Sequence, residues 1–286
     1  MKLNFLQIFM TMASLSFFGT ACAESHDTLD TPADYVSTLV GTQSKHSFST
    51  GNTYPAVARP WGMNFWTPMT GTMGNGWTYS YTDDRIRGFK QTHQPSPWIN
   101  DYGQFALMPV TVGEVFDQDA RASWFSHKAE TAKPYYYSVY LADHDVFTEL
   151  TVTERAAAFR LTYPERERSY LIIDAFDNGS WVKVIPEKNM VVGYTTKNSG
   201  GVPENFRNWF VVVCDTPFDY VRTVSDGRNM SESLSSESFH SGALVGFKTA
   251  RGQKVGLRVA SSFISLEQAE RNLAELGDGD FDRLVA

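Results

Sequence analysis

The chain has 286 residues and a formal net charge of −7 at pH 7, with 42% hydrophobic residues and no cluster of basic side chains. This acidic balance argues against a nucleic-acid partner and against binding to anionic membrane surfaces. It is typical of a soluble exported protein that acts on neutral substrates. About 260 residues remain after an N-terminal targeting segment, enough for one large all-β domain or two smaller ones.

Residues 1–23 have the features of a secretory signal peptide. Lys2 supplies a weakly basic start, and residues 5–18 are mostly apolar. This apolar stretch is too short and too polar to span a bilayer. The sequence ACA at residues 21–23 offers a cleavage site of the kind that signal peptidases use. The segment therefore predicts export to the periplasm or the cell exterior.

A second processing route involves Cys22. The sequence GTAC at residues 19–22 is an imperfect lipoprotein box, and lipidation of Cys22 would anchor the protein to a membrane. Either route leaves residues 24–33 as a mature N-terminal tail. If Cys22 is cleaved off, Cys214 remains alone, so neither an internal disulfide nor a thiolate metal site can form. Because Cys214 ends an apolar run, we expect a buried, inert thiol.

Strand signals dominate from residue 34 onward. Short segments rich in β-branched and aromatic residues are separated by clusters of Gly, Pro, Asn and Asp. Many such segments with no helical pattern between them predict an all-β fold, a large antiparallel β-sandwich over residues 34–264. The Ser-rich segment 226–240 is expected to be a surface loop. The main expected strands are 105–108, 135–141, 146–153, 158–163, 171–176, 209–214 and 255–260.

One of these segments shows a clear alternation. Val146, Leu150 and Val152 share one face of the expected strand. Glu149, Thr151 and Thr153 share the other face, which gives the period of two that is typical of a half-buried strand. We therefore expect the polar face of this strand to be in contact with solvent.

One helix is predicted, close to the end of the chain. Ser265 begins a capping box, in which its hydroxyl accepts from the third helical amide and Gln268 reaches back. Four apolar residues from Leu266 to Leu276 follow at 3-4-3 spacing and form one stripe, and Gly277 ends the helix. An all-β domain offers this stripe no obvious partner, so we expect it to be exposed.

The most distinctive stretch for chemistry is residues 88–109, GFKQTHQPSPWINDYGQFALMP. It places His93, Trp98, Asn100 and Asp101 in a loop that two prolines make stiff. Aromatic faces stack on the C–H faces of sugars, and amide and carboxylate groups bond to hydroxyls, so the loop is a candidate for carbohydrate binding. The alternative is an ordered surface loop in which Trp98 fills the core and the polar side chains bond to the backbone.

Trp77 follows a Gly-rich segment and is a further candidate for sugar contact at the same rim as Trp98. Its alternative role is core packing. Asp83 and Asp84 are adjacent, and adjacent residues of an extended segment point to opposite faces, so they do not flank one glycosidic bond. A solvated turn explains this pair better.

Neither a metal site nor a catalytic pair emerges from the remaining polar residues. The six histidines lack the spacing that converging metal ligands show. Arg85 and Arg87 are suited to hydroxyls or carboxylates, and equally to surface ion pairs. We therefore assign no metal ligand within the chain, and these side chains alone name no catalytic residue.

Four motifs occur in series along the chain. They are YVSTLVGT at 35–42, NTYPAVARPWGM at 52–63, the 88–109 stretch and ELTVTER at 149–155. Together they resemble the N-terminal domain of glycoside hydrolase family 92, the calcium-dependent exo-α-mannosidases. The resemblance covers roughly residues 34–265 and implies a large β-sandwich.

The resemblance also implies where the chemistry lies. In this family a helical linker leads into an (α/α)-barrel domain that carries the catalytic acid, the catalytic base and the Ca²⁺ ligands. Residues 265–286 are then the linker helix and the start of a missing barrel domain. The active site lies in the cleft between the two domains, and the 88–109 stretch is the best match for the loop that contributes to substrate recognition. Transfer of individual roles beyond Trp98 and its neighbours stays open.

Three functions remain at this point. The chain is the non-catalytic part of an inverting α-mannosidase acting on mannose-containing glycans, a free-standing carbohydrate-binding β-sandwich, or a structural domain without a ligand. The amphipathic helix favours the first, because a free-standing sugar-binding module has no need of an unpartnered helix after its last strand.

Overall fold

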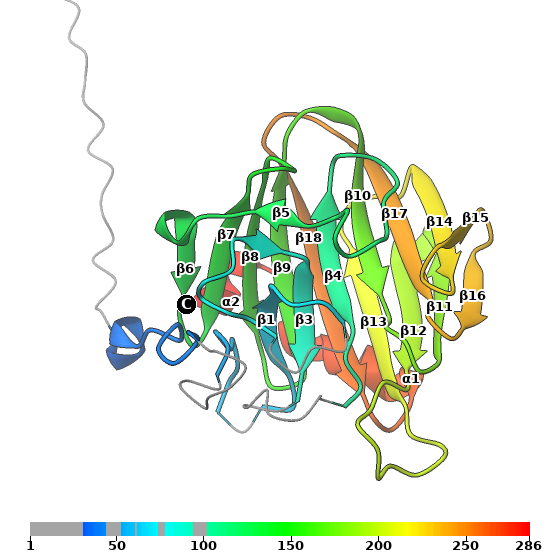
Figure 1. Ribbon diagram of the computed structural model, residues 1–286, viewed down its shortest axis with the longest axis horizontal. Coiled ribbons are helices and arrows are strands. Elements are labelled where there is room, and N and C mark those ends of the chain that lie inside the picture. Colours follow the sequence, from blue (N-terminus) through cyan, green and yellow to red (C-terminus); the bar gives the residue numbers. More distant parts are fainter. Residues whose placement is uncertain (1–30, 44–52, 61, 74–77, 94–101) are drawn as a thin grey trace, which may run out of the picture. The chain divides into compact units, whose positions relative to one another are not determined.

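Two large antiparallel sheets, packed face to face, make up most of the structure (Figure 1). The computed structural model describes residues 31–43, 53–60, 62–73, 78–93 and 102–286. The predicted signal peptide and Cys22 lie outside these residues. Within the described part, the all-β sandwich predicted from the strand pattern is confirmed, since every strand pair is antiparallel.

Neighbouring strands within each sheet are often distant in the sequence. In spatial order, the described residues form a seven-stranded sheet of β1 (Phe65–Met69), β3 (Gly88–Thr92), β4 (Ala106–Val110), β10 (Arg166–Asp174), β17 (Gly242–Thr249), β14 (Tyr220–Ser225) and β15 (Asn229–Ser231). They also form a nine-stranded sheet of β16 (Ser235–Ser238), β11 (Ser180–Ile185), β12 (Met190–Thr195), β13 (Asn208–Cys214), β18 (Gln253–Ser262), β9 (Ala156–Tyr163), β8 (Val146–Val152), β7 (Tyr136–Leu141) and β6 (Glu130–Ala132). A small third sheet pairs β2 (Arg85–Ile86) with β5 (Ser123–Trp124).

Aromatic side chains from both sheets meet in the core between them. The Trp66 ring of β1 makes edge contacts with Phe105 and Phe159, at centroid distances of 5.5 and 5.1 Å. Phe105 also stacks on Phe210 of β13, at 4.4 Å. All four side chains are at most 2% exposed. Cys214 is buried as expected, and burial raises the pKa of its thiol.

All seven of the main expected strands occur, with shifted ends. The strand expected at 171–176 is β10, which begins at Arg166 and ends at Asp174. It stops early because Phe176 and Asn178 have positive φ angles of 62° and 74°, which no extended strand tolerates. The segment 226–240 is not simply a loop: it forms β15 on one sheet and β16 on the other, both largely exposed.

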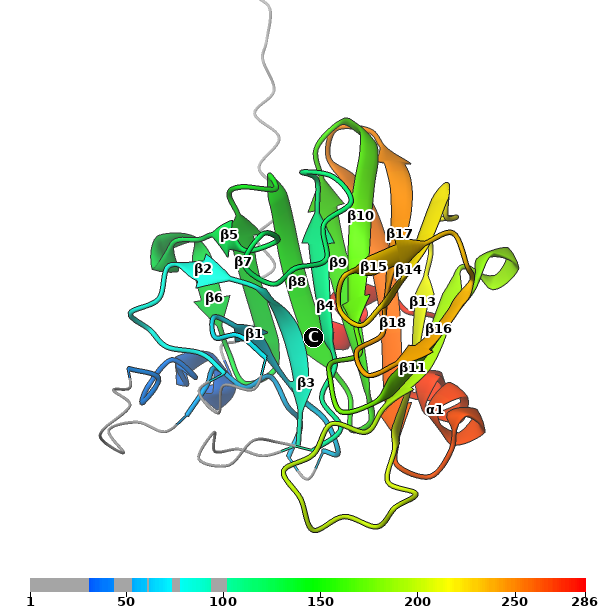
Figure 2. The same cartoon turned by 45° about the vertical axis from the view of Figure 1, so that its right-hand side comes forward.

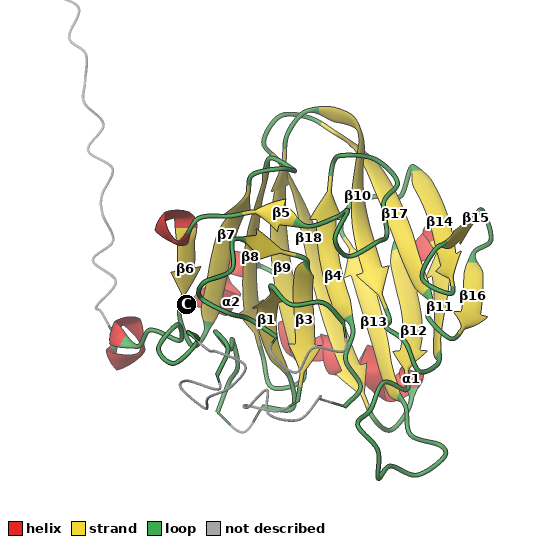
Figure 3. Ribbon diagram, in the orientation of Figure 1, coloured by secondary structure: helices red, strands yellow, loops and turns green. Residues whose placement is uncertain are grey.

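Helices near the C-terminus cover the outer face of the nine-stranded sheet (Figures 2 and 3). They are α1 (Leu266–Asn272), the 3₁₀ turn η4 (Leu273–Leu276) and α2 (Phe281–Val285). Ala269, Leu276 and Phe281 are 0, 1 and 8% exposed, and they pack with Ala156 and Ala158 of β9. The prediction of an exposed apolar stripe is therefore wrong, because small side chains on the strands leave room for the helices. The other short helices are η1 (Pro32–Tyr35), η2 (His127–Ala129) and η3 (Pro186–Lys188).

The ends of the predicted helix are largely confirmed. The Ser265 hydroxyl accepts a hydrogen bond from the Gln268 amide at 3.2 Å, and Gly277 ends the helical segment with a φ of 55°. The reciprocal half of the capping box does not form. Gln268 Nε2 donates instead to Asn272 Oδ1 at 2.9 Å, because Asn272 lies one turn further along the same face.

The polar face of β8 is not solvated, contrary to the expectation from its alternation. Glu149 and Thr151 are 7 and 1% exposed. The Glu149 carboxylate accepts from Arg160 at 2.6 and 2.7 Å and from the Tyr136 hydroxyl at 2.9 Å. Arg160 in turn binds Asp282 of α2 at 2.7 Å. Burial alone would raise the pKa of Glu149, but the bonds from Arg160 and Tyr136 lower it.

Candidate functional site

The ends of the predicted sugar-binding loop are fastened to each other. His93 follows β3 directly, and its Nδ1 donates to the carbonyl oxygen of Tyr102 at 2.7 Å. In a neutral imidazole the other nitrogen, Nε2, is then an acceptor. This bond agrees with the alternative in which polar side chains of the loop bond to the backbone, and sugar contact by His93 stays a prediction. Trp77, Trp98, Asn100 and Asp101 lie outside the described residues, so their roles in sugar binding stay predictions.

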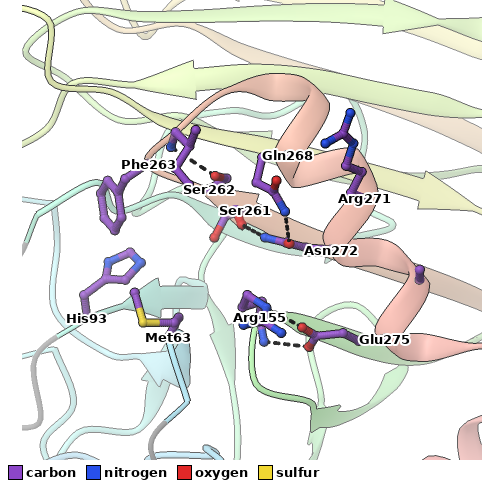
Figure 4. A pocket seen from close by; sticks show the side chains of 12 residues that line it. Met63, His93, Arg155, Ser261, Ser262, Phe263, Gln268, Arg271, Asn272 and Glu275 are labelled. Atoms are coloured by element: carbon purple, nitrogen blue, oxygen red, sulfur yellow. Dashed lines mark hydrogen bonds and ion pairs between the residues drawn. The ribbon is translucent and has the colours of Figure 1, made fainter.

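A pocket of about 780 Å³ lies between this loop stem and the start of the C-terminal helices (Figure 4). His93 is on one side of it, and the polar side chains of α1 are on the other. The pocket lies where β18 ends and the chain turns into α1, and residues from four segments of the chain line it. It is lined by Met63, His93, Arg155, Ser261, Ser262, Phe263, Ile264, Gln268, Arg271, Asn272, Ala274 and Glu275.

A row of aromatic rings extends from the pocket. His93 lies against Phe263 at a centroid distance of 4.8 Å, Phe263 against Phe206 at 5.5 Å, and Phe206 edge-on to Tyr102 at 6.2 Å. Phe263 remains 40% exposed. Exposed ring faces beside hydrogen-bonding groups suit the amphipathic surface of a sugar. Sequence reasoning missed Phe206 and Phe263, because neither belongs to the loop motif and the fold alone brings them to it.

The pocket has an apolar rim formed by two of its lining residues. Met63 is 57% exposed and Ile264 is 80% exposed. Large apolar side chains that share one rim are a common feature of surfaces that contact another domain or a ligand. The rim is therefore a candidate contact surface.

The carboxylate of the pocket is already fully engaged. Glu275 accepts from Arg155 Nε at 2.5 Å, from the Arg155 amide at 2.9 Å and from the Thr153 hydroxyl at 2.8 Å. Among the described lining residues it is the single Asp or Glu. Glycoside hydrolysis needs two carboxyl groups across the scissile bond. Glu275 therefore braces the helices against the segment between β8 and β9, and the described lining offers no second carboxyl group beside it.

The acidic pair and the two arginines noted in the sequence lie away from the pocket. Asp83 and Asp84 are exposed in a turn, and Asp83 accepts from the Thr70 hydroxyl at 2.7 Å. Arg85 pairs with Asp143 at 3.4 Å, and Arg87 pairs with Asp119 at 2.8 Å. The solvated turn and the surface ion pairs are thus confirmed.

A buried ionic cluster at the end of β10 has a structural role. The Asp174 carboxylate, with no exposed surface, forms an ion pair with Arg121 Nη2 at 2.8 Å and accepts a hydrogen bond from His240 Nε2 at 2.7 Å. Burial alone would raise the pKa of Asp174, but the charge of Arg121 and the hydrogen bond from His240 lower it well below its usual range. The cluster joins β10 to the loop before β17.

A second buried carboxylate fastens the segment before β2. Glu130 of β6 accepts from the Tyr79 hydroxyl at 3.0 Å, from the Tyr137 hydroxyl at 2.5 Å and from His127 Nδ1 at 2.6 Å. His127 Nε2 lies 2.7 Å from the Tyr81 carbonyl oxygen. Burial raises the pKa of Tyr79 and Tyr137, which keeps both phenols protonated as donors. These residues do not line the pocket.

Comparison with known proteins gives this geometry a context. The family model described as the glycosyl hydrolase family 92 N-terminal domain matches residues 35–262. The structure of an inverting mannosidase of family 92 from Bacteroides thetaiotaomicron VPI-5482 is 44% identical to this chain, with a TM-score of 0.85. The match covers 88% of this chain and 34% of that one. None of the curated proteins compared with the chain matches it.

A second solved structure agrees. A family 92 α-mannosidase from Bacteroides thetaiotaomicron is 27% identical, with a TM-score of 0.76, and its match covers 88% of this chain and 36% of that one. It has also been solved in complex with mannoimidazole. The chain thus spans about a third of the length of both structures. The chain belongs to glycoside hydrolase family 92, and residues 35–262 are its N-terminal domain.

Proposed function

We propose that the chain is the substrate-recognition domain of an inverting α-mannosidase that acts on mannose-containing glycans. The observation that carries this proposal is the 44% identity with the inverting mannosidase structure over 88% of the chain. Because the chain spans 34% of that relative, the proposed hydrolysis belongs to a full-length parent. The partner of this domain is then an (α/α)-barrel domain that follows it.

The pocket beside His93 is the proposed contact with the substrate. The ring faces of His93 and Phe263 suit stacking on a sugar, and Gln268 and Arg271 offer hydrogen-bond donors across the pocket. The apolar rim of Met63 and Ile264 suits the barrel domain as a neighbour. In this arrangement the described residues bind and orient the glycan, while bond cleavage depends on carboxylates elsewhere.

Calcium belongs to the proposal for the full-length parent, with ligands outside this chain. Within the described residues, no three His, Cys, Asp or Glu side chains gather in an arrangement that would hold a metal ion. The carboxylates at Asp174, Glu130 and Glu275 are committed to protein donors. No step of the proposed recognition by this domain depends on the ion.

Export is the second part of the proposal, supported by the signal-like sequence of residues 1–23. In the part of the chain that the structure describes, no helix is long and apolar enough to cross a membrane. Mass spectrometry of the mature N-terminus distinguishes the two routes. Cleavage after Ala23 supports a periplasmic or extracellular protein, and a lipid on Cys22 supports a membrane-anchored one. An unprocessed Met1 in the exporting host would contradict both.

The activity is tested with the complete protein. We expect it to hydrolyse α-mannosides and to release the β-anomer of mannose first, as observed by NMR during the reaction. Initial release of the α-anomer would contradict inversion, and hydrolysis of other glycosides alone would contradict the substrate. The 286-residue chain by itself should not hydrolyse aryl α-mannosides. Turnover by this chain that stops on addition of a Ca²⁺ chelator would show that its own residues catalyse.

A free-standing sugar-binding module is the alternative, and the aromatic row of His93, Phe263, Phe206 and Tyr102 is the observation that favours it. The alternative predicts that the chain alone binds methyl α-mannoside, and that Phe263→Ala abolishes this binding. Exposed Phe147 of β8 offers a matched control, because Phe147→Ala removes the same ring far from the pocket. Binding without hydrolysis by the complete protein would establish the module in place of the enzyme.

A further inference from the structure

A continuous chain of buried side-chain hydrogen bonds joins helix α1 to the stem of the 93–102 loop. Asn272 Nδ2 donates to the Ser261 carbonyl oxygen at 2.8 Å, and the hydroxyl of the same serine accepts from Gln91 Nε2 at 2.9 Å. Asn208 Nδ2 donates to Gln91 Oε1 at 3.0 Å and to the Gly103 carbonyl oxygen at 2.6 Å. None of the four side chains is more than 8% exposed.

The amide orientations in this relay are fixed from both ends. At the loop end, a backbone carbonyl can only accept, so Asn208 must present its NH₂ group, and Gln91 must present Oε1 to it. Gln91 Nε2 is then the donor toward Ser261. At the helix end, Gln268 Nε2 donates to Asn272 Oδ1 (Figure 4), which leaves Asn272 Nδ2 to donate to the serine carbonyl. A flipped amide at Asn208, Asn272 or Gln268 would place acceptor against acceptor, and a flipped Gln91 would place donor against donor at Asn208.

Asn208 is the junction between the relay and the loop stem. A Cβ on Gly103 would lie 2.5 Å from the Asn208 Cβ and 2.9 Å from the Phe263 ring, so the stem backbone is packed directly on both. Gly103 has a φ of 68° and its amide donates to the Lys197 carbonyl at 2.6 Å. Among the described residues, Asn208 Oδ1 has no hydrogen-bond partner. A buried amide oxygen without a partner costs stability. The two hydrogen bonds that Asn208 donates must offset this cost in the folded protein.

We propose that Asn272 is a positioning residue for the stem of the 93–102 loop, acting through Ser261, Gln91 and Asn208. Docking of α1 on the nine-stranded sheet then fixes the backbone of Gly103 on the far side of the pocket. The C-terminal helix is thus part of the substrate site and not only a connection to the next domain. This inference rests on the proposed function only in treating the loop stem as part of that site.

Hydrogen exchange and ¹H–¹⁵N NMR of the 286-residue chain test the relay without any enzyme assay. Asn272→Ala should speed exchange of the Gly103 amide by about fivefold or more, the equivalent of one lost hydrogen bond. The side-chain amide resonances of Asn208 should shift at the same time. Glu270→Ala, which changes an exposed residue of the same helix, is the matched control and should change neither observable.

A second variant separates the relay from simple loosening of the helix. Ser261→Ala keeps the backbone carbonyl that accepts from Asn272 and removes the hydroxyl that accepts from Gln91. It should speed exchange at Gly103 and shift the Asn208 resonances, while the Ala269 amide, which donates to Ser265 within the helix, stays protected.

Both variants must affect Gly103 for the proposal to stand. Unchanged Gly103 exchange in Asn272→Ala overturns it, whatever happens at Ala269. Acceleration in Asn272→Ala without any in Ser261→Ala also overturns it, because the effect then reaches the stem by another route. Since neither observable involves a mannoside, the relay and the proposed mannosidase function fail independently of each other.

Discussion

The two faces of the nine-stranded sheet are both covered, but by different means. The inner face buries large rings such as Phe159 and Phe210 against the opposite sheet. The outer face carries small residues such as Ala156 and Ala158, over which the C-terminal helices pack. Ion pairs surround this second contact, from Arg160 to Asp282 and from Arg155 to Glu275.

This difference shows how a β-sandwich acquires a helical layer at a defined position. Hydrophobic attraction by itself is non-directional. Charged hydrogen bonds have a set geometry, and each one on the outer face joins a single residue of the β8–β9 region to a single residue of the helices. We therefore expect the inner face to supply more of the stability, and the ion pairs of the outer face to set where η4 and α2 lie.

The largest expected effect is that of removing the helical layer. Deleting residues 265–286 takes away the burial of Leu276 and Phe281, which together correspond to about 3–6 kcal/mol. It also exposes Ala156 and Ala158 of β9. We expect a clear fall in Tm and lower solubility of the truncated chain. An unchanged Tm would mean that the helices contribute nothing to the sandwich.

The next largest effect is expected from a substitution on the inner face. Phe159 is 2% exposed and contacts Trp66 and Phe89, so Phe159→Ala leaves a cavity in the core. We expect a loss of about 3–5 kcal/mol in the free energy of unfolding, measured by urea denaturation. The exposed ring of Phe147 on the neighbouring strand β8 provides the control, since Phe147→Ala should cost far less. Equal losses in both variants would contradict the assignment of stability to the inner face.

The comparison of faces also marks what the sequence alone can predict. The alternation of Val146, Leu150 and Val152 gives a strand and its core face correctly, because strand period is a local property. The burial of Glu149 on the opposite face could not be predicted. It depends on Asp282 and the helices, more than a hundred residues away, whose position the strand pattern does not contain.

The candidate site, too, could be predicted from the sequence only in part. The loop motif identified His93, and the Ser265 cap correctly marked the start of the helix that forms the opposite wall of the pocket. Phe206 and Phe263 complete the aromatic row only through tertiary contacts. The Asn208 relay was equally hidden, since a single Asn at the start of an apolar strand carries no local signal of its partners.

A change at the outer-face ion pair is expected to have a smaller effect. Arg160→Ala leaves the nearly buried Glu149 carboxylate with the Tyr136 hydroxyl as its remaining partner, and it removes the bond to Asp282. We expect a loss of about 2–3 kcal/mol in the free energy of unfolding, as is usual when a charged partner is removed. Arg283 pairs with Asp278 at the exposed surface, so Arg283→Ala should cost less than about 1 kcal/mol. Similar losses in the two variants would show that the outer-face pair is an ordinary surface contact.

The smallest effect at neutral pH concerns the buried carboxylate of the seven-stranded sheet. The pKa of Asp174 is lower in the folded chain than in the unfolded one, so the folded state binds fewer protons and the stabilisation is present above about pH 4. It is lost as the pH falls through the folded-state pKa. His240→Gln removes the imidazole that donates to Asp174, so it raises the pKa of Asp174 and should move the acid-unfolding midpoint up by about half a unit. An unchanged midpoint would show that His240 does not contribute to the stability of the protein in acid.

A structure of the complete protein with mannoimidazole bound would decide whether this end of the sandwich meets the substrate. We predict that the sugar-like ring contacts the pocket between the loop stem and α1, with His93 or Phe263 against it. We also predict that the relay from Asn272 to Gly103 is intact in that complex. An inhibitor that touches no residue of this pocket, with the pocket filled by the following domain, would contradict the proposed role of the pocket in substrate recognition.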